Sequence, residues 1–138
     1  KEKKLDVCKA VKIALVHDLP EAICGDIASR AKEQDQAVSN KEKHRIEEKA
    51  LDEILKELDK ETGKEISGLW HDLEERKSRE AKLVSELDRL EAIFQAVEYE
   101  KSGNFEVSLQ EFYDYADARV KSKNLREIFE ALMKEKEK

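Results

Sequence analysis

The sequence predicts an all-α protein, and three observations support this. Only four glycines and one proline interrupt 138 residues, and 43% of the residues are charged, many of them the Glu and Lys that favour helices. Apolar residues recur at steps of three and four along most of the chain. No stretch alternates convincingly with the period of two that indicates a strand. The length suits a single domain over residues 1–138 with its own hydrophobic core.

The charge balance and the two cysteines narrow the class of protein. A formal net charge of −6 argues against a nucleic-acid partner, because binding to phosphates requires a basic surface. No apolar run approaches the length that would cross a membrane, and no signal peptide is visible. Cys8 and Cys24 lack the spacing of a paired motif. We therefore expect a cytoplasmic protein with reduced cysteines and no membrane partner.

The first predicted helix covers residues 5–16 and becomes apolar nearly all round towards its end, which is typical of a buried helix. Pro20 then either kinks this helix or opens a new short turn, because proline suits the first helical position. Gly25 is expected to end that turn. The polar, aperiodic residues 29–38 predict a loop.

Capping signals divide the middle of the chain. Ser39 and Glu42 have the spacing of a capping box, and Ser78 is expected to cap a long helix. Gly63 is expected to end the helix that Ser39 opens, with a shorter helix after it. The apolar stripes of these three helices are Ile46, Ala50, Leu51, Ile54, Leu55 and Leu58, then Ile66, Leu69, Trp70 and Leu73, then Leu83, Leu87, Leu90, Phe94 and Val97.

A turn at Ser102, Gly103 and Asn104 separates these helices from the last two. The stripes of the last two are Leu109, Phe112, Tyr113, Ala116 and Val120, then Leu125, Ile128, Phe129, Leu132 and Met133.

The segment that carries chemistry lies at the end of the first helix. His17 and Asp18 follow an apolar run directly. Glu21 comes four residues after the histidine, and Asp26 comes directly after Gly25. Such ionisable groups beside apolar residues are costly unless they are paired or bind a cation. Imidazole and carboxylate together suit Mn²⁺, Co²⁺, Zn²⁺ or Mg²⁺, which can polarise a phosphoryl oxygen and activate water.

A His-Asp dipeptide alone is a weak signal, and the chain contains a second one at His71 and Asp72. That pair lies in an amphipathic helix without an apolar lead-in or a following Gly-Asp, so we expect a surface pair. His44 lies in a charged run, and we expect it to be solvated. Asp88 is a candidate ligand at the edge of an apolar stripe, or a boundary residue paired with Arg89 or a lysine.

The segment ALVHDLPEAICGDI, residues 14–27, resembles the motif of the HD-domain 5′-deoxynucleotidases, which include the YfbR-like phosphohydrolases. The segments KEKHRIEEKAL and REAKLVSELDRLEAIFQAVEYE resemble two later helices of that family, so the likeness extends from about residue 5 to residue 113. The resemblance implies an all-α HD-domain helical bundle. It also implies metal-dependent hydrolysis of (deoxy)ribonucleoside 5′-monophosphates, with one of Mn, Co, Mg or Zn as the metal, in a homodimer.

The resemblance also assigns roles to individual residues. The metal ligands would be His17, Asp18 and Asp88, with Asp18 also counted as catalytic. The acid that handles the proton of the attacking water would be Glu21. Candidates for holding a second metal are Glu21, Asp26 and Ile27, and the segment that contacts the substrate is Asp26, Ile27, Ala28 and Ser29.

One family feature is absent from the sequence. The first metal-binding histidine of the family precedes the His-Asp pair, whereas the sixteen residues before His17 contain no His, Arg or Trp. We therefore expect a bundle that lacks its first helix or helices. Two alternatives to the enzyme stay open: a non-catalytic helical module that self-associates through uncovered apolar faces, and a nucleotide-sensing HD module.

Overall fold

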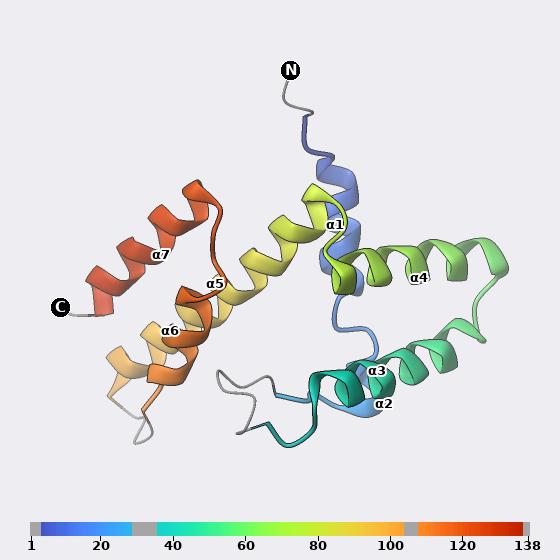
Figure 1. The fold of residues 1–138 in the computed structure, drawn as a ribbon, viewed down its shortest axis with the longest axis horizontal. Coiled ribbons are helices and arrows are strands. Elements are labelled where there is room, and N and C mark those ends of the chain that lie inside the picture. The colour runs from blue at the N-terminus through green and yellow to red at the C-terminus, as the bar shows by residue number, and fades with distance from the viewer. Residues whose placement is uncertain (1–3, 29–35, 104–107, 137–138) are drawn as a thin grey trace. The chain divides into compact units, whose positions relative to one another are not determined.

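The computed structural model describes residues 4–28, 36–103 and 108–136, which form seven helices and no strand (Figure 1). The all-α prediction is confirmed. The helices are α1 (Val7–Val16), α2 (Glu21–Cys24), α3 (Asn40–Leu55), α4 (Lys60–Glu75), α5 (Arg79–Ser102), α6 (Gln110–Asp117) and α7 (Lys123–Lys136).

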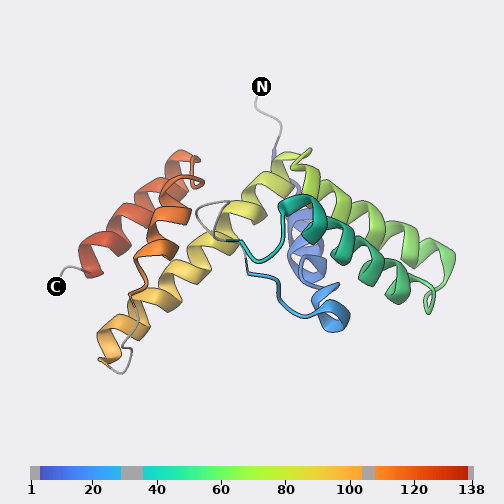
Figure 2. The same cartoon turned by 60° about the horizontal axis from the view of Figure 1, so that its bottom comes forward.

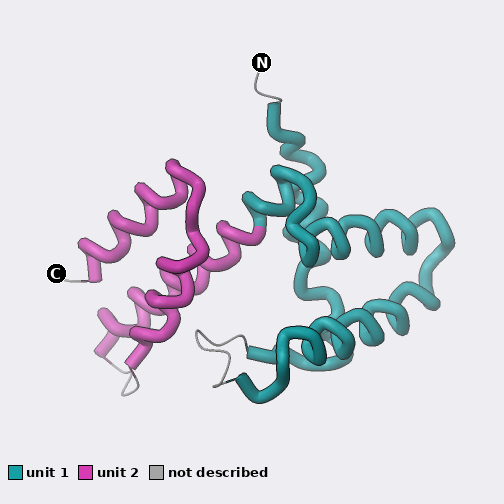
Figure 3. The backbone as a smooth tube through the Cα atoms, in the orientation of Figure 1, with its two compact units in different colours: residues 1–29, 33–84 teal, residues 30–32, 85–138 magenta. Residues whose placement is uncertain are grey.

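The chain divides into two compact units, coloured in Figure 3. The first unit comprises residues 1–29 and 33–84, and the second comprises residues 30–32 and 85–138. The boundary falls inside α5, so the first turns of this helix belong to the first unit.

The first unit is built on an antiparallel hairpin of α3 and α4, which lie side by side in both views (Figures 1 and 2). Helix α1 packs against α4, and α2 packs against α3. A small apolar core joins α1 to the start of α5, with two partly buried leucines of α4 against it. Its members are Ala10, Ile13, Ala81, Val84, Leu69 and Leu73.

The turn after α1 agrees with the prediction made for Pro20 and Gly25. Pro20 is buried and is the N-cap residue of the four-residue helix α2, so it opens a new turn. Gly25 ends that helix with φ 73° and ψ 166°, a backbone conformation that is essentially restricted to glycine. The loop predicted for residues 29–38 lies mainly outside the described residues, which resume at residue 36.

Burial of α1 on all sides was a wrong prediction. Ala10 and Ile13 are buried, but Val7, Val11 and Leu15 are 66%, 53% and 76% exposed. Their spacing of four places these three on one side of the helix. The prediction failed because neighbouring helices of the described chain cover only the Ala10 and Ile13 side. We call Val7, Val11 and Leu15 the α1 stripe.

Gly63 does not end a helix, so that prediction was also wrong. It lies buried inside α4, which is as long as α3 at 16 residues. The break between them is capped by Asp59, whose side chain accepts hydrogen bonds of 3.0 Å from the backbone N atoms of Glu61 and Thr62. A Cβ at Gly63 would lie 3.7 Å from the Leu55 carbonyl oxygen, an ordinary contact distance, so Gly63 lies where the end of α3 meets α4.

The two predicted serine caps are confirmed. Ser39 Oγ accepts from the backbone N of Glu42 at 3.2 Å, and Ser78 Oγ accepts from that of Ala81 at 3.1 Å. The apolar stripe predicted for α5 was only partly right. Its members Leu87 and Phe94 are 44% and 49% exposed. The buried residues between positions 83 and 97 are Val84, Leu90, Ile93, Ala96 and Val97.

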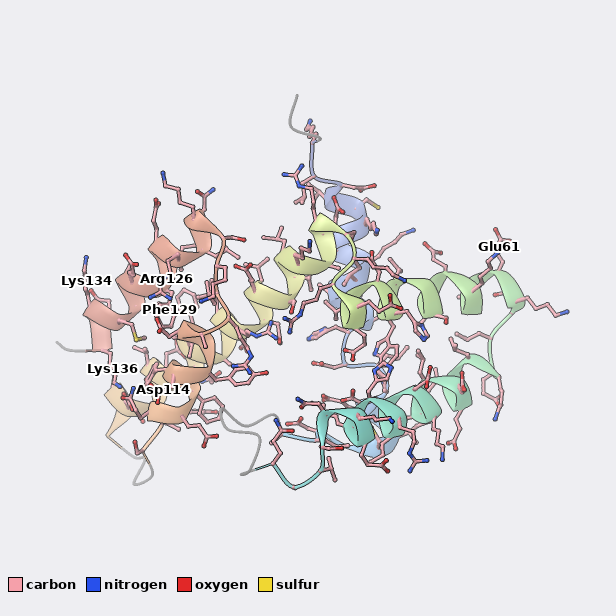
Figure 4. All side chains as sticks on the ribbon, in the orientation of Figure 1. Glu61, Asp114, Arg126, Phe129, Lys134 and Lys136 are labelled. Atoms are coloured by element: carbon pink, nitrogen blue, oxygen red, sulfur yellow. The ribbon has the colours of Figure 1, made fainter. Side chains whose placement is uncertain are left out.

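The second unit consists of the rest of α5 with α6 and α7, whose existence the sequence predicted. Glu86 of α5 accepts hydrogen bonds from the backbone N atoms of Lys121 and Ser122, at 3.0 and 2.9 Å, just before α7. Figure 4 labels Arg126 and Phe129 on α7, where the guanidinium lies 4.9 Å from the ring centroid. The described part of the predicted turn after α5 ends at Gly103, and Asn104 lies outside the described residues.

Candidate active site

His17 and Asp18 form the centre of the candidate site, where α1 ends. The Nδ1 atom of His17 lies 2.7 Å from the carbonyl oxygen of Ala14, one turn earlier in the helix. A carbonyl oxygen only accepts hydrogen bonds, so Nδ1 carries the hydrogen. The ring orientation is therefore fixed by the helix itself, and in neutral His17 the lone pair lies on Nε2.

That Nε2 atom lies 2.9 Å from Oδ2 of Asp18. Two acceptors at this distance repel each other unless a proton or a cation lies with them. A nitrogen lone pair beside a carboxylate oxygen is also the donor set that divalent transition metals prefer. The second nitrogen of a metal-binding histidine commonly donates to a backbone carbonyl, as Nδ1 does here. The two side chains therefore fit a metal ion.

Glu21 begins α2, and its backbone N donates to the Asp18 carbonyl at 2.9 Å. Burial raises the pKa of the Glu21 carboxyl, and the negative charges of Asp18 and Asp26 raise it further. Asp18 and Asp26 thus lie close enough to Glu21 for their charges to act on it. A carboxylate with a raised pKa binds a proton or a cation more readily than an ordinary glutamate does.

The segment after Gly25 is held by a residue that sequence reasoning missed. Lys43 of α3 donates a hydrogen bond of 2.6 Å from Nζ to the carbonyl oxygen of Ile27. The same Nζ lies 3.5 Å from Oε1 of Glu47, whose side chain is 10% exposed. Asp26 and Ala28 are exposed, and Ser29 lies outside the described residues.

The sequence did contain a signal for Glu47. It precedes the buried residues Ala50 and Leu51 by three and four positions, which places it on the same side of α3. A glutamate on the apolar side of a helix requires a partner or a role. Lys43, one turn earlier, was the candidate partner that this argument would have found.

Asp88, the third predicted ligand, lies on α5 in the second unit and is exposed. The candidate residues His17, Asp18, Glu21, Asp26 and Ile27 belong to the first unit. Within the described ranges, no group of three His, Cys, Asp or Glu side chains is arranged to hold a metal ion. The prediction that Asp88 completes the site stays a prediction.

The prediction of a surface pair at the second His-Asp dipeptide was wrong for Asp72, whereas the His71 side chain is 37% exposed. The Asp72 side chain is 12% exposed and lies 2.6 Å from Lys9 Nζ, which ties α4 to α1. It also accepts from the backbone N and the hydroxyl of Ser78, at 2.8 and 2.7 Å. His44 was expected to be solvated, but its ring stacks on that of Trp70 with the ring centroids 5.4 Å apart. Its Nδ1 also lies 3.0 Å from Oε2 of Glu74.

Comparison with known families identifies the architecture. The family model described as HD domain matches residues 1–129, which is most of the chain. The chain belongs to the HD domain family. The assignment of His17 and Asp18 as the His-Asp pair of this family stays a prediction, whereas Asp72 stabilises the fold through Lys9 and Ser78.

Several curated proteins are similar to this HD domain. It is 41% identical over 115 residues to the 5′-deoxynucleotidase HDDC2 of Dictyostelium discoideum, across 81% of this chain and 58% of that protein. It is 42% identical over 114 residues to the 5′-deoxynucleotidase HDDC2 of Bos taurus, across 83% of this chain and 53% of that protein. The Danio rerio protein of the same name is 41% identical over 128 residues, across 93% and 62%.

The HD domain chain spans between about half and three-fifths of the length of these relatives. None of the helices in the described ranges is both long and apolar enough to cross a membrane. Cys8 and Cys24 are free thiols.

Proposed function

We propose that this HD domain is part of a metal-dependent phosphohydrolase that removes phosphate from (deoxy)ribonucleoside 5′-monophosphates. Family membership and the names of the relatives support a phosphohydrolase acting on nucleotides. The observation that carries the proposal is the 2.9 Å separation of His17 Nε2 and Asp18 Oδ2. Nδ1 of the same ring is occupied by a backbone carbonyl, so Nε2 is the nitrogen available to a metal ion.

In this proposal His17, Asp18 and Asp88 hold the metal, which would be Mn²⁺, Co²⁺, Mg²⁺ or Zn²⁺. When bound, such an ion polarises a phosphoryl oxygen and lowers the pKa of bound water. Glu21, Asp26 and the Ile27 carbonyl are the candidates for holding a second ion. Asp18 is proposed to act in catalysis as well as in metal binding, and its carboxylate lies beside Nε2 of His17.

Glu21 takes the proton from the attacking water in this proposal. Its burial and its acidic neighbours raise its pKa, and a carboxylate with a raised pKa is a stronger base. The substrate lies against the segment Asp26, Ile27, Ala28 and Ser29. A cytoplasmic location also remains a prediction, in keeping with the free thiols of Cys8 and Cys24.

The proposal is tested by phosphate release from a panel of deoxyribonucleoside and ribonucleoside 5′-monophosphates. The assay uses the full-length protein with each of the four metals and with a chelator. We expect metal-dependent release that Asp18→Ala abolishes, while the exposed control Asp52→Ala retains it. Retained activity in Asp18→Ala would contradict the mechanism. Nucleotide binding without release at any metal would favour the nucleotide-sensing alternative.

The α1 stripe favours a second candidate function, a helical module that self-associates. Val7, Val11 and Leu15 are all more than half exposed on one side of a helix, and apolar side chains grouped in this way mark association surfaces. A homodimer formed through the stripe would bury them. Size-exclusion chromatography with light scattering tests this, with Leu15→Lys as the variant expected to dissociate the assembly. A monomeric wild type would contradict it.

A further inference from the structure

The Ile27 carbonyl is held from outside its own segment, by a side chain of α3. Lys43 Nζ donates to it at 2.6 Å across 16 residues of sequence. A hydrogen bond from an ammonium group is stronger than one between neutral groups. Because Lys43 sits on the regular helix α3, the contact fixes the segment after Gly25 to a rigid element of the same unit.

Lys43 is itself held in place by Glu47. The two residues lie four apart on α3, with Nζ and Oε1 3.5 Å apart, and their side chains are only 23% and 10% exposed. Burial raises the pKa of Glu47, and the charge of Lys43 opposes that rise. The largely buried pair restricts the ammonium to one region beside α2, which packs on α3.

The same ammonium acts on the candidate catalytic acid. Lys43 lies close enough to Glu21 for its positive charge to act on the carboxylate. Other lysines that the structure describes pair with side-chain carboxylates: Lys9 and Lys12 contact α4, and Lys101 contacts Glu135 of α7. Lys43 differs because it contacts a main-chain carbonyl of the proposed substrate segment.

We propose that Lys43, held by Glu47, is a positioning residue that fixes the Asp26–Ala28 segment relative to Glu21. This inference rests on the proposed function, because it assigns the segment to substrate contact. The hydrogen bond fixes the Ile27 carbonyl, and the backbone on both sides of it has little freedom to move. Substrate binding then requires no ordering of the segment, which favours affinity.

The experiment compares Lys43→Met with Lys41→Met in the full-length protein. Methionine keeps most of the stem and removes the ammonium, and Lys41 is an exposed residue in the first turn of the same helix. Hydrogen exchange of the peptide containing residues 25–28 reports on the hydrogen bond from Lys43 to the Ile27 carbonyl, and it requires no enzymatic activity. Loss of a charge-assisted hydrogen bond predicts exchange faster by about tenfold or more in Lys43→Met.

The second measurement separates KM from kcat for a deoxyribonucleoside 5′-monophosphate. We expect KM to rise by about tenfold in Lys43→Met with a smaller change in kcat, because ordering the segment would then oppose binding. Lys43→Arg retains a cationic donor and is expected to restore most of the exchange protection and of the KM. Lys41→Met is expected to match the wild type in both measurements.

Each contrary outcome has its own meaning. Unchanged exchange in Lys43→Met, or faster exchange with unchanged KM and kcat in an active protein, overturns the inference and leaves the proposed function standing. A wild type that releases no phosphate from any nucleotide overturns the proposed function and this inference with it. If Lys43→Met fails to fold, Glu47→Gln tests the same tether, since it removes the charge that holds Lys43.

Discussion

Nε2 of His17 and Oδ2 of Asp18 lie 2.9 Å apart at the end of α1, and the Ala14 carbonyl fixes the histidine ring from its other nitrogen. The arrangement is local, since all three residues lie within five positions of one another. A helix end therefore presents a nitrogen and an oxygen donor together, whatever the rest of the domain contributes.

The first prediction concerns metal binding by this pair. His17→Gln and Asp18→Asn are each expected to weaken Mn²⁺ binding by at least about 100-fold, because losing only an outer-shell partner costs 10–100-fold. Isothermal titration calorimetry of the full-length protein measures this directly. His71→Gln is the control, because His71 belongs to the other His-Asp dipeptide. An equal loss in the control would contradict the assignment.

The second prediction compares two glycines. Gly25 has φ 73° and ψ 166°, whereas Gly68 lies inside α4, and a Cβ added at either position would meet no atom within 4 Å. Gly25→Ala is therefore expected to lower the free energy of unfolding by about 1–3 kcal/mol through backbone strain alone. Gly68→Ala is expected to raise it by roughly 0.5–1 kcal/mol, as alanine is the better helix former. Urea unfolding measures both, and a shift of the same sign in both would contradict this reading.

The third prediction assigns Asp72 to stability. Burial tends to raise its pKa, but hydrogen bonds from Lys9 and Ser78 lower it overall. The stability that Asp72 contributes is therefore present above its unfolded pKa of 3.8, and is lost as the pH falls through the folded value. Asp72→Ala is expected to cost about 2–3 kcal/mol at neutral pH, because it leaves charged and polar partners unmatched.

Thermal or urea unfolding measures this loss, with Asp52→Ala as the exposed control expected to change little. Metal affinity should be the same in folded Asp72→Ala as in the wild type. A selective loss of metal binding with intact stability would show instead that the second His-Asp pair is the functional one.

Features set by neighbours in sequence were predictable. The caps at Ser39 and Ser78 and the stop at Gly25 depend on residues within one turn. The choice of His17 and Asp18 over the second dipeptide also came from local context, and it stays a prediction. These features are encoded in the backbone preferences of a few adjacent residues, so periodicity and spacing reveal them.

Features set by tertiary contacts were not predictable. Gly63 was expected to end a helix, but it lies where the end of α3 approaches α4. Asp72 was expected at the surface, but α1 supplies Lys9 to cover it. The exposed Leu15 has the same apolar character as the buried Ile13, so only the packing of α4 and α5 distinguishes them. Periodicity identifies the apolar side of a helix, but it does not identify which other helix packs against that side.

The last prediction uses Glu47 to separate stability from function. Burial raises the pKa of Glu47 despite the opposing charge of Lys43, so the fold disfavours its ionised form. The contribution of Glu47 to the free energy of unfolding is greatest below its unfolded pKa of 4.5. This contribution is lost as the pH rises through the pKa of Glu47 in the folded protein. The glutamine of the Glu47→Gln variant does not titrate, so the stability of the variant relative to the wild type is expected to increase as the pH rises from 4.5 through the folded pKa of Glu47.

Urea unfolding across this pH range measures the difference, with Glu53→Gln, an exposed position of the same helix, as the matched control. The same Glu47→Gln variant should bind substrate more weakly, since Lys43 loses the charge that holds it beside the Ile27 carbonyl. Unchanged substrate affinity in Glu47→Gln would contradict the role assigned to the Lys43–Glu47 pair.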